Sequence, residues 1–310
     1  MSLIPKISIG MPTYNSAETI SASIESLLGQ SYADFELIVS DNASTDLTRE
    51  VVEALAHQDQ RIRYVRQPEN AGVCPNYTYV AQVARGEFFK WSTSSDWCAP
   101  TFLERCLDEL LTHDDAVLVA PRTRLFQTNL STAQDYALDI DLLDDEPSAR
   151  LMSLIRTLAL NNAMNGLIRM SALRDTRLVE PYIGADIVLM GHLALLGKFR
   201  LVDERLFYRR MDPKTATVLQ DVPTKWRHHY PRQSARTLFQ GCKRQLGWVR
   251  TVLSAEMSIG ERLRCLETVA RQCYYDRRAF LEDLNGLWSY CTRATWPLKL
   301  LLVCASLPPL

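Results

Sequence analysis

Two polar turns near the start of the chain carry the residues best suited to bind a ligand. The first reads PTYN at residues 12–15 and follows an apolar run at 7–11; the second reads DNASTD at 41–46 and follows a run at 35–40. Strands that feed helices in this order build a parallel sheet, and ligands bind at the carboxyl ends of its strands. Polar side chains there, in place of pyrophosphate-cradling glycines, indicate recognition of a base and a ribose.

Short apolar runs and helical spacings alternate along the rest of the chain. Further strands are predicted at 62–65, 87–91, 116–120 and 165–169, with two short strands at 199–202 and 206–209. Helices are predicted at 17–30, directly after 46, and at 74–84, 100–112, 187–196, 223–241, 244–255, 259–283 and 285–293. Residues 127–147 are acidic and irregular, and we expect an exposed loop there.

With 310 residues, the chain can form one large α/β domain and a smaller appendage. We expect a mostly parallel central sheet flanked by helices over residues 1–212. No strand pattern follows Pro213, so residues 213–310 are predicted to form a helical C-terminal extension.

Composition narrows the class of protein. An apolar content of 47% and a charged content of 23% are typical of a folded soluble protein. The eight cysteines include no CxxC pair, which argues against a zinc site and a disulfide framework and favours a reducing compartment. We expect no leader peptide, because the first residues enter a strand directly. The apolar run at 298–307 contains Lys299 and is too short to span a bilayer.

Charge is distributed unevenly along the chain. Residues 225–310 carry 14 Lys and Arg against 6 Asp and Glu, a formal charge of +8 in a protein whose total is −1. A basic, helix-prone segment with an apolar end at 296–303 could lie on an anionic membrane surface. It could equally form a solvated helical cap whose arginine stems pack on the main domain.

Taken in order, the motifs resemble those of the family 2 glycosyltransferases, which have the GT-A fold. The resemblance covers about residues 6–211. It rests on the turns at 12–15 and 41–46, Asn70-Ala71-Gly72 with Asn76, GEFFKW at 86–91, the acidic strand end at Asp96, Gly184-Ala185-Asp186, and LFYRR at 206–210. Each motif alone is weak, but together and in this order they are specific.

The resemblance implies an inverting enzyme that transfers a sugar from a nucleoside-diphosphate sugar. Such a reaction needs a base for the acceptor hydroxyl and a means of stabilising the diphosphate leaving group. The match makes Asp186 the catalytic base and makes Asp41 the partner of the nucleotide base. Residues 1–120 would bind the donor and residues 121–212 the acceptor. The expected donor-binding residues are Pro12, Thr13, Tyr14, Asn15, Glu18, Asp41, Asn42, Ser44, Asn70, Asn76, Ser94, Ser95, Asp96, Arg209 and Arg210.

The chain departs from the family at the expected Mg²⁺ or Mn²⁺ site. The family's DxD motif would place carboxylates at 94 and 96, but Ser94 and Ser95 precede Asp96. Magnesium sites at phosphates usually use one or two carboxylates. Asp96 could suffice together with the donor's phosphates. Alternatively Asp212, where relatives often carry a metal-binding histidine, could help, or the arginines at 209–210 could neutralise the diphosphate instead.

Local backbone chemistry offers a second explanation for three of the acidic residues. An Asp that opens a helix is favoured there by capping and by the helix dipole, which applies to Asp186. Asp41 and Asp46 lie in a turn sequence, where Asp commonly bonds the backbone. We expect this local role for Asp46 and a functional role for Asp41 and Asp186.

Two classes of function remain open from the sequence. The first is a glycosyltransferase that uses a UDP-sugar and a glycan or lipid-linked acceptor in bacterial exopolysaccharide or lipopolysaccharide synthesis. The second is a catalytically degenerate relative that serves as a binding or scaffold subunit, and the reduced DxD motif is its support. The presence of Asp41, Asp96 and Asp186 together favours the enzyme. A nicotinamide-dependent oxidoreductase is disfavoured because no GxGxxG follows the first strand. We expect a cytoplasmic protein, peripheral on the inner membrane face if the basic tail binds lipid, with no nucleic-acid partner.

Overall fold

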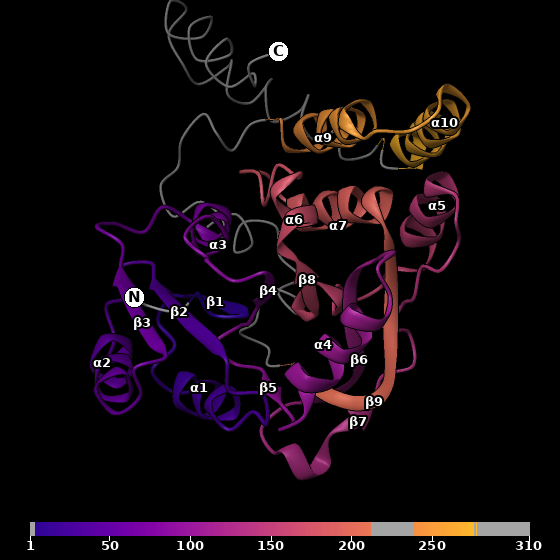
Figure 1. Ribbon diagram of the computed structural model, residues 1–310. Coiled ribbons are helices and arrows are strands. Elements are labelled where there is room, and N and C mark those ends of the chain that lie inside the picture. The colour runs from indigo at the N-terminus through magenta and orange to yellow at the C-terminus, as the bar shows by residue number, and fades with distance from the viewer. Residues whose placement is uncertain (1–3, 212–238, 276, 278–310) are drawn as a thin grey trace, which may run out of the picture.

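The computed structural model describes residues 4–211, 239–275 and 277. In the described part, a curled sheet lies between helices, and two further helices cover the helical layer on one side (Figure 1). The strands are β1 (Ile7–Thr13), β2 (Phe35–Asp41), β3 (Ile62–Arg66), β4 (Phe88–Trp91), β5 (Trp97–Cys98), β6 (Ala116–Phe126), β7 (Gln134–Asp135), β8 (Leu167–Arg169) and β9 (Lys198–Arg210).

The α-helices are α1 (Ile20–Leu28), α2 (Thr48–Gln58), α3 (Val73–Gln82), α4 (Phe102–Thr112), α5 (Pro147–Thr157), α6 (Met170–Arg174), α7 (Ala185–Leu196), α9 (Gln240–Ser254) and α10 (Ile259–Tyr275). Two 3₁₀ turns, η1 (Leu130–Thr132) and η2 (Ala163–Asn165), lie in the connections.

The sheet brings both polar turns to one edge, as the sequence predicts. Its strand order is β3-β2-β1-β4-β8-β6-β9-β5, with β7 beside β6. β1, β2, β3 and β4 run parallel, and Thr13 at the end of β1 pairs with Asp41 at the end of β2. β8 is antiparallel to β4 and β6, whereas β9 runs parallel to β6. The α/β architecture expected from the sequence is therefore confirmed.

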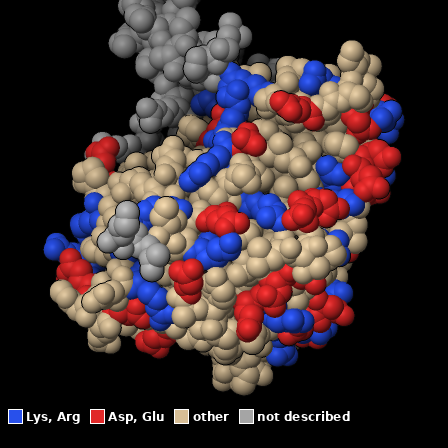
Figure 2. Space-filling view, viewed as in Figure 1, with Lys and Arg blue, Asp and Glu red and all other residues tan. Residues whose placement is uncertain are grey.

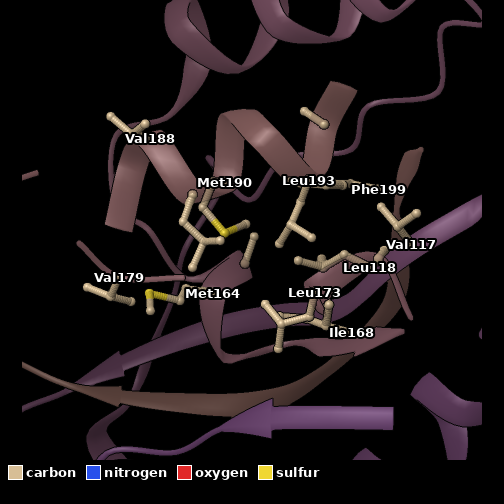
Figure 3. Close-up of a cluster of buried hydrophobic side chains, with 14 of the residues drawn as sticks. Val117, Leu118, Met164, Ile168, Leu173, Val179, Val188, Met190, Leu193 and Phe199 are labelled. Atoms are coloured by element: carbon tan, nitrogen blue, oxygen red, sulfur yellow. The ribbon is translucent and has the colours of Figure 1, made fainter. Parts of the chain in front are cut away.

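Helix α7 is buried along most of its length, because the sheet lies on one side of it and the C-terminal helices lie on the other. Figure 3 shows Met190 and Leu193 pointing from α7 toward Leu118 and Ile168 of the sheet; all four are essentially inaccessible to solvent. The burial of these side chains fixes the position of the helix that begins beside Asp186.

Helices α9 and α10 continue the same core instead of standing apart from it. The buried side chains Trp248, Val252 and Cys265 belong to the cluster that also contains α5 and α7 residues. Figure 1 shows α9 and α10 lying over α7 and α5. Most of the predicted helices at 223–241 and 285–293 lies outside the described residues, and so does the apolar end at 296–303.

Two sequence expectations are wrong in detail. The strands expected at 199–202 and 206–209 form the single strand β9, because the polar residues between them extend it and form ion pairs with neighbouring segments, such as that of Asp203 with Arg122. The segment 127–147 is not simply an exposed loop, because it forms η1 and β7 and buries Ile140 and Leu142. The sequence prediction missed these two buried side chains because most residues around them are acidic.

The visible surface carries no extended patch of one charge. Acidic and basic side chains are intermingled over the face seen in Figure 2. Among the described residues, no helix is both long and apolar enough to cross a bilayer.

Candidate active site

The two polar turns bind each other and form one rigid unit. The backbone N–H of Asn15 donates to Ser44 Oγ at 2.9 Å, and the N–H of Thr45 donates to Asn15 Oδ1 at 2.8 Å. Asn15 adopts a positive φ of 49°, which asparagine tolerates better than most residues. Beside this unit, Thr13 Oγ1 is buried with no hydrogen-bond partner among the described residues, and Tyr14 is 42% exposed. An orphaned hydroxyl at a strand's carboxyl end is suited to a bound polar ligand.

Asp41 is fully buried at the end of β2 and is held by three donors. Its Oδ1 accepts from the Ser44 N–H at 2.8 Å, and its Oδ2 accepts from Tyr64 Oη at 2.7 Å and from Arg66 at 3.0 Å. Burial, and then the hydrogen bond to Asp41 and its negative charge, raise the pKa of Tyr64 to about 12. The Tyr64 hydroxyl therefore stays protonated and orients the carboxylate.

Asp46 has the local role that the sequence predicts. Its Oδ1 accepts from the Thr48 N–H at 3.0 Å and the Thr48 hydroxyl at 2.5 Å, and its Oδ2 accepts from the Ala17 N–H at 3.1 Å. Burial by itself would raise the pKa of Asp46, but these hydrogen bonds outweigh it and lower the pKa. Asp46 thus ties the start of α2 to the first turn.

Three of the expected donor-binding amides make internal bonds. Asn76, on α3, accepts from Ser40 Oγ at 2.5 Å and donates to the Ser40 carbonyl at 2.9 Å. Asn42 donates to Asn70 Oδ1 at 2.8 Å and to the Gly72 carbonyl at 3.0 Å. These contacts fix the entry of α3 against the end of β2, so in this structure the three amides shape the site's wall.

Asp96 is buried just before β5, with its carboxylate directed at the end of β9. Its Oδ1 accepts from the backbone N–H of Arg210 at 2.8 Å, and its own N–H donates to Thr93 Oγ1 at 3.2 Å. Burial raises the pKa of Asp96, although the Arg210 and Thr93 hydrogen bonds and the charges of Arg209 and Lys90 oppose this. Ser94 Oγ bonds Ser16 Oγ at 2.8 Å, which joins the Asp96 loop to the first polar turn.

Asp186 lies in the first turn of α7, after Gly184, whose φ of 84° suits glycine. The N-cap residue is Gly184, which has no side chain to cap the helix. Asp186 Oδ2 accepts from Asn161 Nδ2 at 3.0 Å. An acidic residue in the first turn is also favoured by the helix dipole. Asp186 is half-buried.

Arg209, at the end of β9, donates to Asn162 Oδ1 at 2.7 Å. Asn162 in turn donates to Asp139 Oδ1 at 3.0 Å, and Asp139 accepts from the N–H and hydroxyl of Thr123. A chain of hydrogen bonds therefore connects the Arg209 guanidinium to Thr123 on β6 and fixes its position.

Helix α3 lies between the two halves of the fold and carries Tyr77. Burial raises the pKa of Tyr77, the negative charges of Asp96 and Asp186 raise it further, and the charge of Arg209 lowers it. Thr78 Oγ1 donates to the Val179 carbonyl at 2.8 Å, so α3 physically connects the N-terminal half of the fold to the segment that leads to Asp186.

The described part of the site offers one protein ligand for a divalent cation, the carboxylate of Asp96. Among the described residues, no group of three or more His, Cys, Asp or Glu side chains could hold a metal ion. Asp96 offers one carboxylate, which is bonded to the backbone at the end of β9, so the remaining oxygen ligands would come from phosphates and water. Asp212, the other expected ligand, lies outside the described residues.

The sequence model for glycosyl transferase family 2 matches residues 8–176, which is more than half of the chain. This chain belongs to glycosyl transferase family 2. A chondroitin synthase of Pasteurella multocida strain Pm70 is 26% identical over 229 residues, which is 73% of this chain but 23% of that protein. A hyaluronan synthase of Pasteurella multocida is 32% identical over 108 residues, 35% of this chain and 11% of that protein. The chain thus spans a quarter or less of the length of these two relatives.

Solved structures agree with the GT-A fold. S. aureus TarS 1–349, solved in complex with UDP, superposes with a TM-score of 0.63 at 18% identity, covering 88% of this chain and 73% of that one. The mannosyltransferase PcManGT of Pyrobaculum calidifontis, solved with GDP-Man and Mn²⁺, gives a TM-score of 0.53 at 15% identity, covering 98% and 80%. At these identities the likeness shows the fold alone.

Three residues with direct contacts to the site were not expected from the sequence: Arg66, Asn161 and Asn162. Arg66 lies at the end of β3, a strand-end position that could have drawn attention. The other two carry no local pattern, because only the packing of distant segments brings them to the site.

Proposed function

We propose that this family 2 chain is an inverting glycosyltransferase. It transfers a sugar from a nucleoside-diphosphate sugar to a hydroxyl group of a glycan or lipid-linked acceptor. The observation that carries the proposal is a set of hydrogen bonds that links the three groups: Asp96 accepts from the Arg210 N–H, Arg209 donates to Asn162, and the adjacent Asn161 donates to Asp186. Burial next to oriented dipoles strengthens the electrostatic effect of each.

Each group has a distinct part in the proposed mechanism. The base of the nucleotide binds beside Asp41, with Thr13 and Tyr14 at the nucleoside. Arg209 and Arg210 face the diphosphate and neutralise the charge that grows on it as it leaves. Asp186 accepts the proton of the acceptor hydroxyl, which then attacks the anomeric carbon from the face opposite the diphosphate.

A divalent cation, Mg²⁺ or Mn²⁺, would supply Lewis-acid stabilisation of the diphosphate. Asp96 is the residue that would hold it, with Asp212 as a second candidate. The Mn²⁺ named with the mannosyltransferase neighbour supports this assignment for the fold.

A UDP-sugar is the donor we propose. UDP and UDP-GlcNAc are named with TarS, although GDP-Man is named with PcManGT. The names of the chondroitin and hyaluronan synthases support a polysaccharide product. We propose a peripheral contact of residues 225–310 with anionic lipid at the cytoplasmic face of the membrane, and test it as salt-sensitive binding to anionic vesicles.

Stereochemistry tests the proposed mechanism. A single displacement inverts the anomeric carbon, so an α-linked donor gives a β-glycoside. Proton NMR of the first-formed product from a gluco- or galacto-type donor should show the large anomeric coupling of a β product. A small coupling would exclude the single displacement and with it the role of Asp186. If the chain binds UDP but transfers no sugar to any acceptor, the scaffold function is the correct one.

A further inference from the structure

Two consecutive asparagines hold the two reacting sides of the site. Asn161 Nδ2 donates to Asp186 Oδ2 at 3.0 Å, and Asn162 Oδ1 accepts from Arg209 Nη1 at 2.7 Å. Both lie in the connection between α5 and η2. One short turn therefore contacts the proposed base on α7 and the proposed diphosphate ligand on β9.

The turn is itself firmly anchored. Asn162 is buried, and its Nδ2 is bonded to Asp139, whose carboxylate is fixed by Thr123 on β6. The segment that follows the turn is held as well, because the Lys90 ammonium donates to the Asn165 carbonyl at 2.6 Å. A side chain that projects from an anchored turn keeps its direction with little loss of entropy when substrate binds.

The amide of Asn161 has one sensible orientation. Its Oδ1 is buried and has no hydrogen-bond partner among the described residues. Turning the amide over would set this oxygen against the Asp186 carboxylate, which is repulsive. A buried unpaired acceptor costs stability, and such a group in a folded protein calls for an explanation. Donation to Asp186 provides one.

We propose that Asn161 and Asn162 are positioning residues for the transfer reaction, and that they act on different steps. Asn161 orients the Asp186 carboxylate toward the acceptor hydroxyl, so it acts on turnover. Asn162 directs the Arg209 guanidinium toward the donor diphosphate, so it acts on donor binding. This inference rests on the proposed function.

Adjacent single variants test the division of labour. Full-length Asn161→Ala should lower kcat for UDP release from UDP-GlcNAc by about 10-fold to 100-fold, as expected for a lost hydrogen bond to a charged group, and leave the Kd for UDP within about threefold. Asn162→Ala should show the reverse pattern, with UDP binding weakened by about 10-fold and kcat within about threefold. Both assays contain Mn²⁺, and melting temperatures are measured for each variant.

Two further variants separate this inference from the proposed function. The isosteric Asn161→Asp keeps the volume but turns a donor into a like charge, so it should lower kcat at least as far as Asn161→Ala. In the Asp186→Asn background, Asn161→Ala should cause no further loss of kcat, because the base through which it acts is gone.

If both asparagine variants change kcat and Kd in parallel with a fall in melting temperature, the turn is only structural and the inference is wrong. The same holds if Asn161→Ala and Asn161→Asp keep full turnover while Asp186→Asn loses it. Full turnover in Asp186→Asn, or no binding of UDP by the wild-type chain, would instead overturn the proposed function.

Discussion

The carboxylate of Asp96 accepts a hydrogen bond from the backbone N–H of Arg210 at 2.8 Å, although 114 residues separate the two in the chain. This bond joins the segment before β5 to the end of strand β9, which carries Arg209 and Arg210. The acidic motif keeps one carboxylate, and that carboxylate is bonded to the backbone of this arginine pair. Donor phosphates bound here would meet both kinds of group.

We expect activity to require a divalent ion. Replacing Asp96 by Asn should remove this ion-dependent activity. The amide oxygen can still accept from Arg210, so the fold is kept while the charge that would hold the cation is lost. We expect turnover to fall by about 10²-fold or more, as for other removed electrostatic groups in active sites. Assays with Mn²⁺ and with excess chelator check this; full wild-type activity in chelator would exclude the metal assignment.

Asp186→Asn should leave UDP binding within about threefold and lower turnover by roughly 10²-fold or more, as expected when a general base is removed. Titration calorimetry with UDP and steady-state kinetics give the two values. Because the Asn side chain keeps an oxygen that can accept from Asn161, the substitution should also leave the melting temperature almost unchanged. A variant with normal turnover would reduce Asp186 to a structural residue of α7.

Stability in acid should depend on Glu36, a buried carboxylate on β2. Burial would raise its pKa, but hydrogen bonds from Arg85 and Ser8 and the Arg85 charge outweigh this and hold the pKa below the usual 4.5. The unfolded chain binds this proton more readily than the folded protein. Its contribution is therefore complete above about pH 4.5 and is lost as the pH falls through the lower folded-state pKa.

The stability of Glu36→Gln, measured by urea denaturation at several pH values, should fall less below about pH 5 than that of the wild type. Glu53→Gln is the matched control, because Glu53 pairs with Arg49 on the exposed surface of α2. Such pairs contribute little, so this variant should follow the wild-type curve. An identical acid profile for Glu36→Gln would contradict the prediction.

Gly191→Ala should destabilise the protein by about 1–3 kcal/mol, the usual cost of overpacking a core. A Cβ at this position on α7 would come 2.1 Å from the Trp248 ring on α9, which is buried and cannot move aside. Thermal unfolding measures the effect. Gly260→Ala on α10 is the control, since its new Cβ would have no neighbour closer than 3.8 Å. Equal melting temperatures for both variants would show that α9 does not pack tightly on α7.

The sequence alone determined the framework of the N-terminal strands. Strands at 35–40 and 62–65 match β2 and β3 closely, because alternating short apolar runs and helix signals are local properties of the chain. The parallel order then follows from the connections, and it brings the turns at 12–15 and 41–46 together at one edge. The local role of Asp46 was likewise predictable, since its partners Thr48 and Ala17 lie in the same pair of turns.

Only the tertiary structure decided how the surroundings of Asp186 and Arg209 are built. Asn161 meets Asp186 across 25 residues, Asn162 meets Arg209 across 47, and Arg210 meets Asp96 across 114. No local sequence pattern predicts which distant residue an asparagine or a backbone N–H will bond. The segment 127–147 is a second example. Its acidic composition predicts an exposed loop, but its residue Asp139 accepts a hydrogen bond from Asn162. Local propensity sets the elements, but long-range packing chooses which polar groups must satisfy one another in the interior.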